Sequence, residues 1–172
     1  MHQYDFDIEE SDADEAFYHG IERRALLTSY LDYYRILKDI PKGETLIDLG
    51  AGYCRGTLLS EYLNLSRCIS IELDQLKTKQ AKEFNGSGDI ICTSILDFNH
   101  EPYNYFFLYF PVNDVLIEFI KKILLRSRNA VFYLIESHGD LVDLFLSFDS
   151  FNLESKLPLS SQRHKDHIYK LS

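Results

Sequence analysis

The segment TLIDLGAGYCRG, residues 45–56, constrains the fold of this chain more than any other. It opens as a short apolar run of strand type. Asp48 stands near the end of that run, and Gly50, Gly52 and Gly56 follow. Because glycine permits sharp turns and close approach of another group to the backbone, the segment predicts a strand that ends in a tight turn. Either a ligand or the protein's own chain must come close to that turn.

Apolar patterns along the rest of the chain alternate between strand and helix types. Residues 20–38 have the spacing of an amphipathic helix, and its apolar face is predicted to hold Ile21, Ala25, Thr28, Leu31 and residues 34–37. Strand-type segments and helical segments then follow in turn. The strands are expected at 45–49, 67–73, 89–95, 104–110 and 129–137, and the helices at 57–65, 74–85, 113–127 and 139–148. Two further strands, 151–158 and 164–172, come last with no helix between them.

This alternation favours right-handed crossovers and a parallel sheet that is buried on both faces. We therefore predict an α/β fold with a doubly wound, mostly parallel sheet in a three-layer α/β/α arrangement. The last two strands are predicted to form an antiparallel C-terminal hairpin. Residues 1–15 are expected to be an acidic, mobile arm, and residues 16–172 a single domain.

The charge of the chain is concentrated at its N-terminus. The net charge is -9, from 27 acids and 18 bases, and residues 1–15 hold seven acids and no Lys or Arg. The remaining 20 acids against 18 bases leave no broad basic face, so we do not expect nucleic acid as a partner. The arm is expected to be solvated, with attraction of a basic protein as the alternative.

Apolar runs, the N-terminal sequence and the cysteines indicate in which cell compartment the protein is expected. We expect no membrane span, because no apolar run approaches the roughly 20 residues that a membrane helix needs. The acidic N-terminus does not have the pattern of a secretory signal. The three cysteines lack CxxC spacing, which is typical of reduced thiols and predicts a cytoplasmic protein. The oligomeric state stays open.

In a doubly wound sheet, ligands bind beyond the carboxyl ends of the strands, where the glycines of residues 50–56 are predicted to lie. Glu72 ends the second predicted strand, roughly twenty residues on, where an acid can bind the hydroxyls of a ribose. A dinucleotide fingerprint, G-x-G-x-x-G, would need glycine at the position of Arg55, and Gly56 comes one place late. No Gly-Lys-Ser/Thr follows, so a Walker phosphate loop is excluded.

The segment DLGAGYCRG resembles the first motif of the class I S-adenosylmethionine-dependent methyltransferases, an acid followed by glycines at alternate positions. Cys54 stands where a third glycine often lies. By this resemblance Glu72 looks like the acid that binds the ribose, and Asp97 like the acid that meets the adenine amino group. The cofactor-binding residues that the resemblance implies are Asp48, Gly50, Ala51, Gly52, Glu72, Leu73, Ile95, Leu96, Asp97 and Tyr109.

The resemblance implies transfer of a methyl group from S-adenosylmethionine, with S-adenosylhomocysteine as product, to a protein side-chain amine or a small molecule. The segment YFPVND would lie beside the methyl group, which makes Tyr109 and Asn113 the candidate catalytic residues. Phe110 and a single Pro111 match only part of the family's pattern of Asn or Asp, Pro-Pro and an aromatic. Tyr109 as a core aromatic and Asn113 as a helix cap are the structural alternatives. A catalytically inactive binding or scaffolding module is the alternative function.

Three further assignments complete the sequence predictions. Tyr18 and His19 lie before the first helix, where they would cover the cofactor or form a surface turn. His138, after the fifth predicted strand, is a candidate base or a solvated side chain. His164 and His167 lack a third ligand nearby, so no metal site is predicted.

Overall fold

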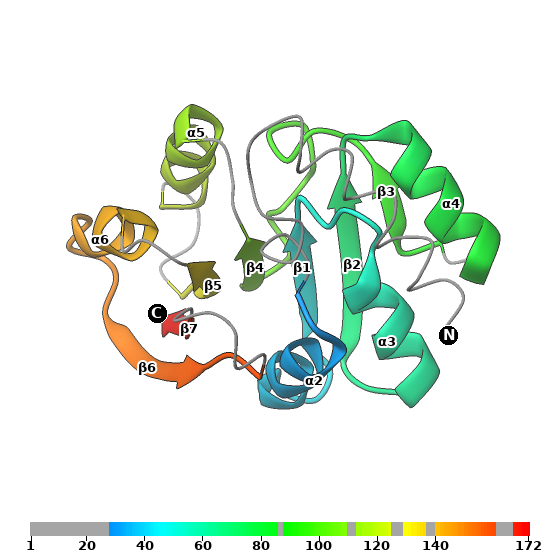
Figure 1. Ribbon diagram of the computed structural model, residues 1–172. Helices are drawn as coiled ribbons and strands as arrows, with labels where there is room; N and C mark the ends of the chain where they lie inside the picture. Colours follow the sequence, from blue (N-terminus) through cyan, green and yellow to red (C-terminus); the bar gives the residue numbers. More distant parts are fainter. Residues whose placement is uncertain (1–27, 86–87, 110–112, 125–128, 137–139, 161–166) are drawn as a thin grey trace.

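The computed structural model describes residues 28–85, 88–109, 113–124, 129–136, 140–160 and 167–172. These residues form one seven-stranded sheet in the order β3-β2-β1-β4-β5-β7-β6, with helices packed against it (Figure 1). The predicted acidic arm, together with Tyr18, His19 and His138, lies outside the described residues. The strands are β1 (Thr45–Leu49), β2 (Arg67–Glu72), β3 (Ile90–Cys92), β4 (Tyr105–Tyr109), β5 (Val131–Glu136), β6 (Leu153–Pro158) and β7 (His167–Leu171).

Strands β1 to β5 pair in parallel, whereas β7 runs antiparallel to both β5 and β6. A helix separates successive strands up to β5 except between β3 and β4, which follow each other with no helix between them. The predicted α/β fold, with a mostly parallel sheet and an antiparallel C-terminal hairpin, is confirmed. The hairpin differs in one detail, since β7 is inserted between β5 and β6 and leaves β6 at the edge of the sheet.

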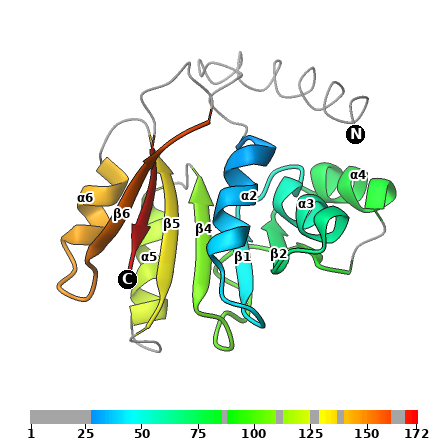
Figure 2. The same cartoon turned by 90° about the horizontal axis from the view of Figure 1, so that it is seen from below.

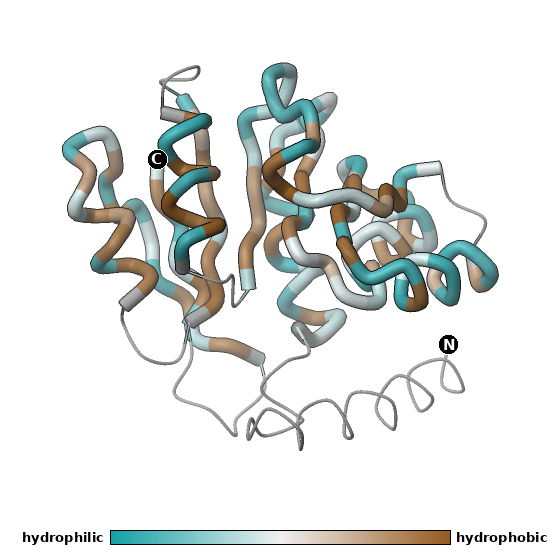
Figure 3. Tube along the Cα trace, turned by 90° about the horizontal axis from the view of Figure 1, so that it is seen from above, coloured by the Kyte–Doolittle hydropathy of each residue, from teal (hydrophilic) through white to brown (hydrophobic). Residues whose placement is uncertain are grey.

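Helices cover the two faces of the sheet in separate groups (Figure 2). One face carries α2 (Tyr30–Asp39), α3 (Arg55–Leu63) and α4 (Gln75–Asn85), and the other carries α5 (Asn113–Leu124) and α6 (Asp140–Leu146). Alternate residues of β1, β2, β4 and β5 enter the two cores. In β4, Phe106 and Leu108 pack toward α5 and α6, whereas Phe107 packs toward α2. Figure 3 colours the chain by hydropathy, and the outermost helix α4 is largely hydrophilic.

The buried face of α2 agrees with the predicted one only in part. Ile36 and Leu37, within the predicted residues 34–37, are buried against the sheet together with Tyr33. Leu31 is 52% exposed, and Tyr34 is exposed as well. Both sets of positions have helical spacing, so the period alone cannot select one face. Ser29 caps this helix, because its hydroxyl oxygen accepts the backbone N–H of Asp32 at 3.1 Å.

Among the described residues, no helix is long and apolar enough to cross a membrane. No group of three or more His, Cys, Asp or Glu side chains in the same part of the chain is placed to hold a metal ion.

Candidate functional site

The loop after β1 has the conformation that its glycines predict. Gly50 and Gly52 have φ angles of 72° and 54°, in the left-handed region that favours glycine. The backbone N–H groups of Gly50 and Ala51 both donate to the Ile71 carbonyl, at 2.9 and 3.1 Å. The end of β2 therefore holds the loop in place at the carboxyl edge of the parallel strands.

The glycines of this segment are of two kinds. A Cβ atom added at Gly50 or Gly52 would meet no atom within 4 Å, so the loop borders open space. A Cβ at Gly56 would lie 2.9 Å from Tyr33 Cε1 and 3.0 Å from Asp48 Oδ2. The first two glycines thus leave room for a ligand beside the backbone, whereas Gly56 is needed for packing of the protein against itself.

Cys54, at the position of the family's third glycine, also has a positive φ, of 57°. A side chain in this conformation costs roughly 1–2 kcal/mol. Its N–H donates to the Ala51 carbonyl at 2.9 Å, and its carbonyl accepts the N–H of Leu58 at 3.1 Å in the first turn of α3. The loop is a strained connection that passes directly into a helix N-terminus.

Glu72 joins this loop to the tip of β2. Its Oε2 accepts the N–H of Gly52 at 2.7 Å, and its Oε1 accepts the N–H of Asp74 at 2.9 Å. The carboxylate is half-buried. Each oxygen of a carboxylate can accept a second hydrogen bond, so Glu72 can still bind a pair of hydroxyl groups.

The segment after β3 turns back along the same edge. β3 ends at Cys92, earlier than predicted, because Ser94 starts a turn: its carbonyl accepts the N–H of Asp97 at 3.1 Å, and its hydroxyl accepts the N–H of Leu96 at 3.2 Å. Asp97 is exposed, and Ile95 and Leu96 are half-buried. Thr93 N–H donates to the Glu72 carbonyl at 3.0 Å, which ties this turn to the tip of β2. Leu73, next to Glu72, is 69% exposed.

No protein-family model matches this sequence, and a comparison with curated proteins finds no match. Solved structures match the fold. An rRNA methylase from Streptococcus thermophilus aligns with a TM-score of 0.61 and 13% identity, over 83% of this chain and 93% of that one. An RNA methyltransferase from Salinibacter ruber, in complex with S-adenosyl-L-homocysteine, aligns with a TM-score of 0.61 and 17% identity, over 84% and 91%. The glycopeptide N-methyltransferase MtfA aligns with a TM-score of 0.68 and 9% identity, over 85% and 96%.

The chain has the class I methyltransferase fold. Within this methyltransferase fold, the glycine loop, Glu72 and the turn at 94–97 lie at the carboxyl ends of β1, β2 and β3 in that order. In a doubly wound sheet, ligands are expected to bind at this same carboxyl edge of the strands.

Asp48 lies beneath the loop instead of at its surface. The side chain is 1% exposed, and its Oδ2 accepts the hydroxyl of Tyr33 at 3.0 Å. Burial raises the pKa of Asp48 to about 7; the hydrogen bond from Tyr33 opposes this rise and the charge of Glu72 adds to it. This carboxyl therefore lies in the core beneath the loop and is closed to solvent.

The candidate catalytic residues Tyr109 and Asn113 lie on either side of residues 110–112. This segment, which includes Phe110 and Pro111, lies outside the described residues. Tyr109 ends β4, is half-buried and packs against the core beneath α2, with Tyr30 nearby in the same cluster. Asn113 is the first residue of α5. Both belong to the carboxyl edge at β4, next to the glycine loop after β1.

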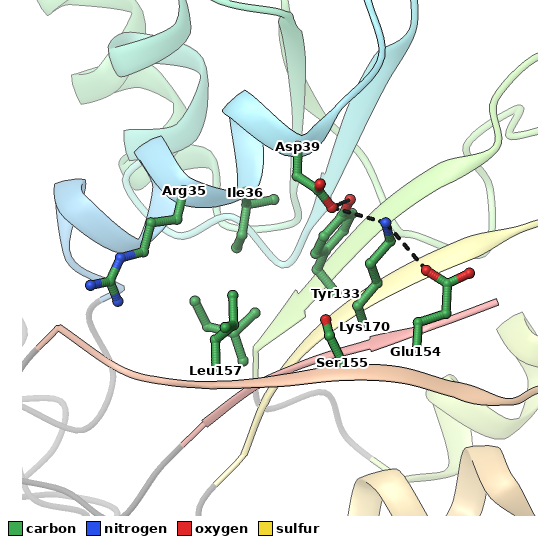
Figure 4. Close-up of a pocket in the computed structure, with 9 residues that line it drawn as sticks. Arg35, Ile36, Asp39, Tyr133, Glu154, Ser155, Leu157 and Lys170 are labelled. Atoms are coloured by element: carbon green, nitrogen blue, oxygen red, sulfur yellow. Dashed lines mark hydrogen bonds and ion pairs between the residues drawn. The ribbon is translucent and has the colours of Figure 1, made fainter.

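A cavity of about 410 Å³ lies elsewhere, between α2 and β6 (Figure 4). At one end Lys170 Nζ lies 3.0 Å from Asp39 Oδ2 and 3.2 Å from Glu154 Oε2. The Tyr133 hydroxyl donates to the same Asp39 oxygen at 2.7 Å. The cavity is lined by residues of α2, β5, β6 and β7, and none of the residues proposed for the loop lines it.

Tyr33 and the packing role of Gly56 were not predicted from the sequence. Tyr33 lies in α2, 15 residues before Asp48 in the chain, and its contact depends on how α2 packs on β1. The helical spacing of Tyr33 with Ile36 and Leu37 was a signal for the buried face. No local pattern in the sequence pairs its hydroxyl with Asp48.

Proposed function

We propose that this protein transfers a methyl group from S-adenosylmethionine to an acceptor that is a protein side-chain amine or a small molecule. The observation that supports this most is the combination of an open glycine loop at Gly50 and Gly52 with Glu72 bonded directly to it. This combination occurs in a fold that the chain shares with methyltransferases.

The residues of the carboxyl edge suit the parts of this cofactor. Glu72 would accept the two ribose hydroxyls, and exposed Asp97 would accept the adenine amino group. Leu73, Ile95 and Leu96 would cover the faces of the adenine ring. Gly50, Ala51 and Gly52 would lie along the ligand with their backbone, while buried Asp48 would act by shaping the loop.

The cofactor supplies an activated methyl group, so the protein must mainly hold the acceptor in line with it and exclude water. Tyr109 and Asn113 are the residues proposed to orient the acceptor, because they flank the segment after β4. The expectation that nucleic acid is not a partner rested on the near-neutral charge of residues 16–172. Because several similar structures are RNA methyltransferases, RNA belongs among the acceptors to be screened.

Calorimetric titration with S-adenosylmethionine and S-adenosylhomocysteine, with NAD as the negative control, tests the cofactor. Glu72→Ala is expected to weaken binding at least about ten-fold, because hydrogen bonds to charged groups contribute roughly 1.5–3 kcal/mol. Glu83→Ala is the matched control, since this exposed glutamate on α4 pairs only across the surface with Lys79, at 3.7 Å. Absence of binding at millimolar ligand would mean that the glycines only form a turn.

A thiol reagent provides a second test of ligand position. Cys54 and Cys68 are buried, whereas Cys92 is exposed and its Sγ lies 3.6 Å from the Leu73 carbonyl oxygen. A bound adenine beside Leu73 is expected to slow modification of Cys92. Protection by S-adenosylhomocysteine but not by NAD would place the ligand at this edge, and equal rates with and without ligand would contradict that placement.

The alternative is a module that retains the fold and the ligand without turnover. Screening of amine-bearing proteins, small molecules and RNA with a labelled methyl donor separates the two functions. For any acceptor found, Tyr109→Ala should reduce turnover even at saturating cofactor, beyond any loss of cofactor affinity. Tyr105→Ala, at the other end of β4 in the same core, controls for lost packing. Equal turnover in the two variants would mean that the acceptor lies elsewhere.

A further inference from the structure

The Tyr33 hydroxyl reaches the end of β1, just before the glycine loop, from a separate helix. It donates to Asp48 Oδ2 at 3.0 Å, and the two residues are 4% and 1% exposed. Asp48 lies two residues before Gly50, where the loop begins. Tyr33 therefore connects α2 to the end of β1 directly beneath the open side of the loop.

Packing holds the Tyr33 ring in that place. Its Cε1 atom occupies the space beside Gly56, in the first turn of α3, where an added Cβ would lie only 2.9 Å away. On the sheet side the ring makes an edge contact with Phe107, with a centroid distance of 5.3 Å and an interplanar angle of 68°. Because neighbours fix the ring on both sides, its hydroxyl is held toward Asp48.

The loop needs such support because its backbone is unusual. Three residues, Gly50, Gly52 and Cys54, have positive φ angles. Glycine adopts such angles readily, whereas at Cys54 the conformation costs energy and persists only because the surrounding structure fixes it. Bonds to the Ile71 carbonyl and the Glu72 carboxylate hold the loop from β2.

We propose that Tyr33 is a positioning residue for the cofactor loop: its hydroxyl holds the Asp48 carboxylate, and thereby keeps residues 50–54 in the conformation that admits the ligand. The ligand part of this proposal rests on the proposed function. Tyr33 itself is buried beneath the loop and acts through Asp48, without touching the ligand.

The charges around Asp48 provide a specific signature. Tyr33 faces it from α2, Glu72 and Cys68 from β2, and Arg55, at the start of α3, acts on Tyr33. Burial raises the pKa of Tyr33, so it stays a hydrogen-bond donor, and its bond to Asp48 lowers the pKa of that carboxyl. Loss of the hydroxyl is therefore expected to move the titration of Asp48 to higher pH, which a purely space-filling ring would not do.

Tyr33→Phe tests the proposal, with Tyr133→Phe as the matched control. Tyr133 also donates its hydroxyl to a carboxylate, that of Asp39, but at the cavity between α2 and β6 (Figure 4). The first readout needs no ligand: backbone amide hydrogen exchange of residues 50–54, compared with amides of β4. Tyr33→Phe is expected to speed exchange in the loop about ten-fold, as expected for loss of a hydrogen bond to a charged group, with β4 unchanged. Tyr133→Phe should leave the loop at the wild-type rate.

Two further readouts complete the test. Carbon-13 NMR titration of the Asp48 carboxyl should show a higher inflection in Tyr33→Phe than in wild type and Tyr133→Phe. Calorimetry should show that S-adenosylhomocysteine binds Tyr33→Phe about ten-fold more weakly, because a smaller fraction of the loop is in the competent conformation.

The outcomes separate this proposal from the proposed function. If wild type binds no S-adenosylhomocysteine, the proposed function fails, while exchange and titration still decide whether Tyr33 positions the loop. Loop exchange and Asp48 titration in Tyr33→Phe that match Tyr133→Phe would overturn the proposal. Faster loop exchange with unchanged affinity would also overturn it, because the loop conformation would then not govern binding.

Discussion

Replacing Asp48 with asparagine is expected to change how the stability of this protein depends on pH. In the folded protein burial raises the pKa of Asp48 to about 7, from an ordinary value of 3.8. Between these two values the folded state binds a proton that the unfolded state has released. The contribution of Asp48 to stability is therefore fully present below about pH 4 and is lost as the pH rises to about 7.

The size of this effect follows from the two pKa values. At 1.36 kcal/mol for each pH unit, the difference between 3.8 and about 7 corresponds to roughly 4 kcal/mol. Asp48→Asn removes the titrating group and keeps an oxygen that can accept the Tyr33 hydroxyl. The amide adds a destabilising offset, because its N–H groups enter a buried site, but this offset does not vary with pH.

Urea unfolding of both proteins, followed by circular dichroism from pH 4 to 8.5, measures the prediction. The free energy of unfolding of wild type minus that of Asp48→Asn should fall by roughly 4 kcal/mol from the acidic to the alkaline end of that range. Acids that do not interact with Asp48 titrate equally in both proteins and cancel in the difference. Two parallel curves would refute the reasoning, because they would show that burial beneath the loop does not favour the protonated form of Asp48.

Two further predictions concern packing and surface charge. Gly56→Ala is expected to destabilise the protein by about 1–3 kcal/mol in thermal unfolding, because the new methyl group would lie 2.9 to 3.1 Å from Tyr33, Asp48 and Cys68. Gly88→Ala is the control. Its methyl group would meet no atom within 4 Å, so its stability should stay within about 0.5 kcal/mol of wild type. Similar losses at both sites would contradict this account. Lys170→Met should cost up to about 1 kcal/mol at low salt and less at high salt, because its ion pairs at the cavity are partly exposed. The check is denaturant unfolding at both ionic strengths, and a loss that does not depend on salt would argue against an electrostatic contribution.

Most of the fold follows from local patterns in the sequence. Residues 106–108 of β4 and 131–135 of β5 are continuous apolar runs, because both faces of a parallel sheet are covered, and the helices show the longer period. The absence of a helix between the last two strands predicted the antiparallel hairpin. The insertion of β7 beside β5 was not predicted, because strand order depends on contacts between distant segments.

The candidate site divides in the same way. Gly50, Gly52 and Glu72 were predicted from their places at the ends of the first two predicted strands, because parallel strands end at one edge, whereas Asp97 was predicted from the resemblance to the methyltransferase family. The ligand that they bind and the roles of Tyr109 and Asn113 stay predictions.

The sequence by itself determined the alternation of strands and helices and the position of the glycine loop, because these depend on hydrophobic period and on the backbone freedom of glycine. Only the tertiary structure decided that Gly50 and Gly52 border open space while Gly56 packs against Tyr33, and that Asp48 is buried with a raised pKa. These properties come from which atoms surround a residue, and those atoms belong to segments that are far apart in the chain.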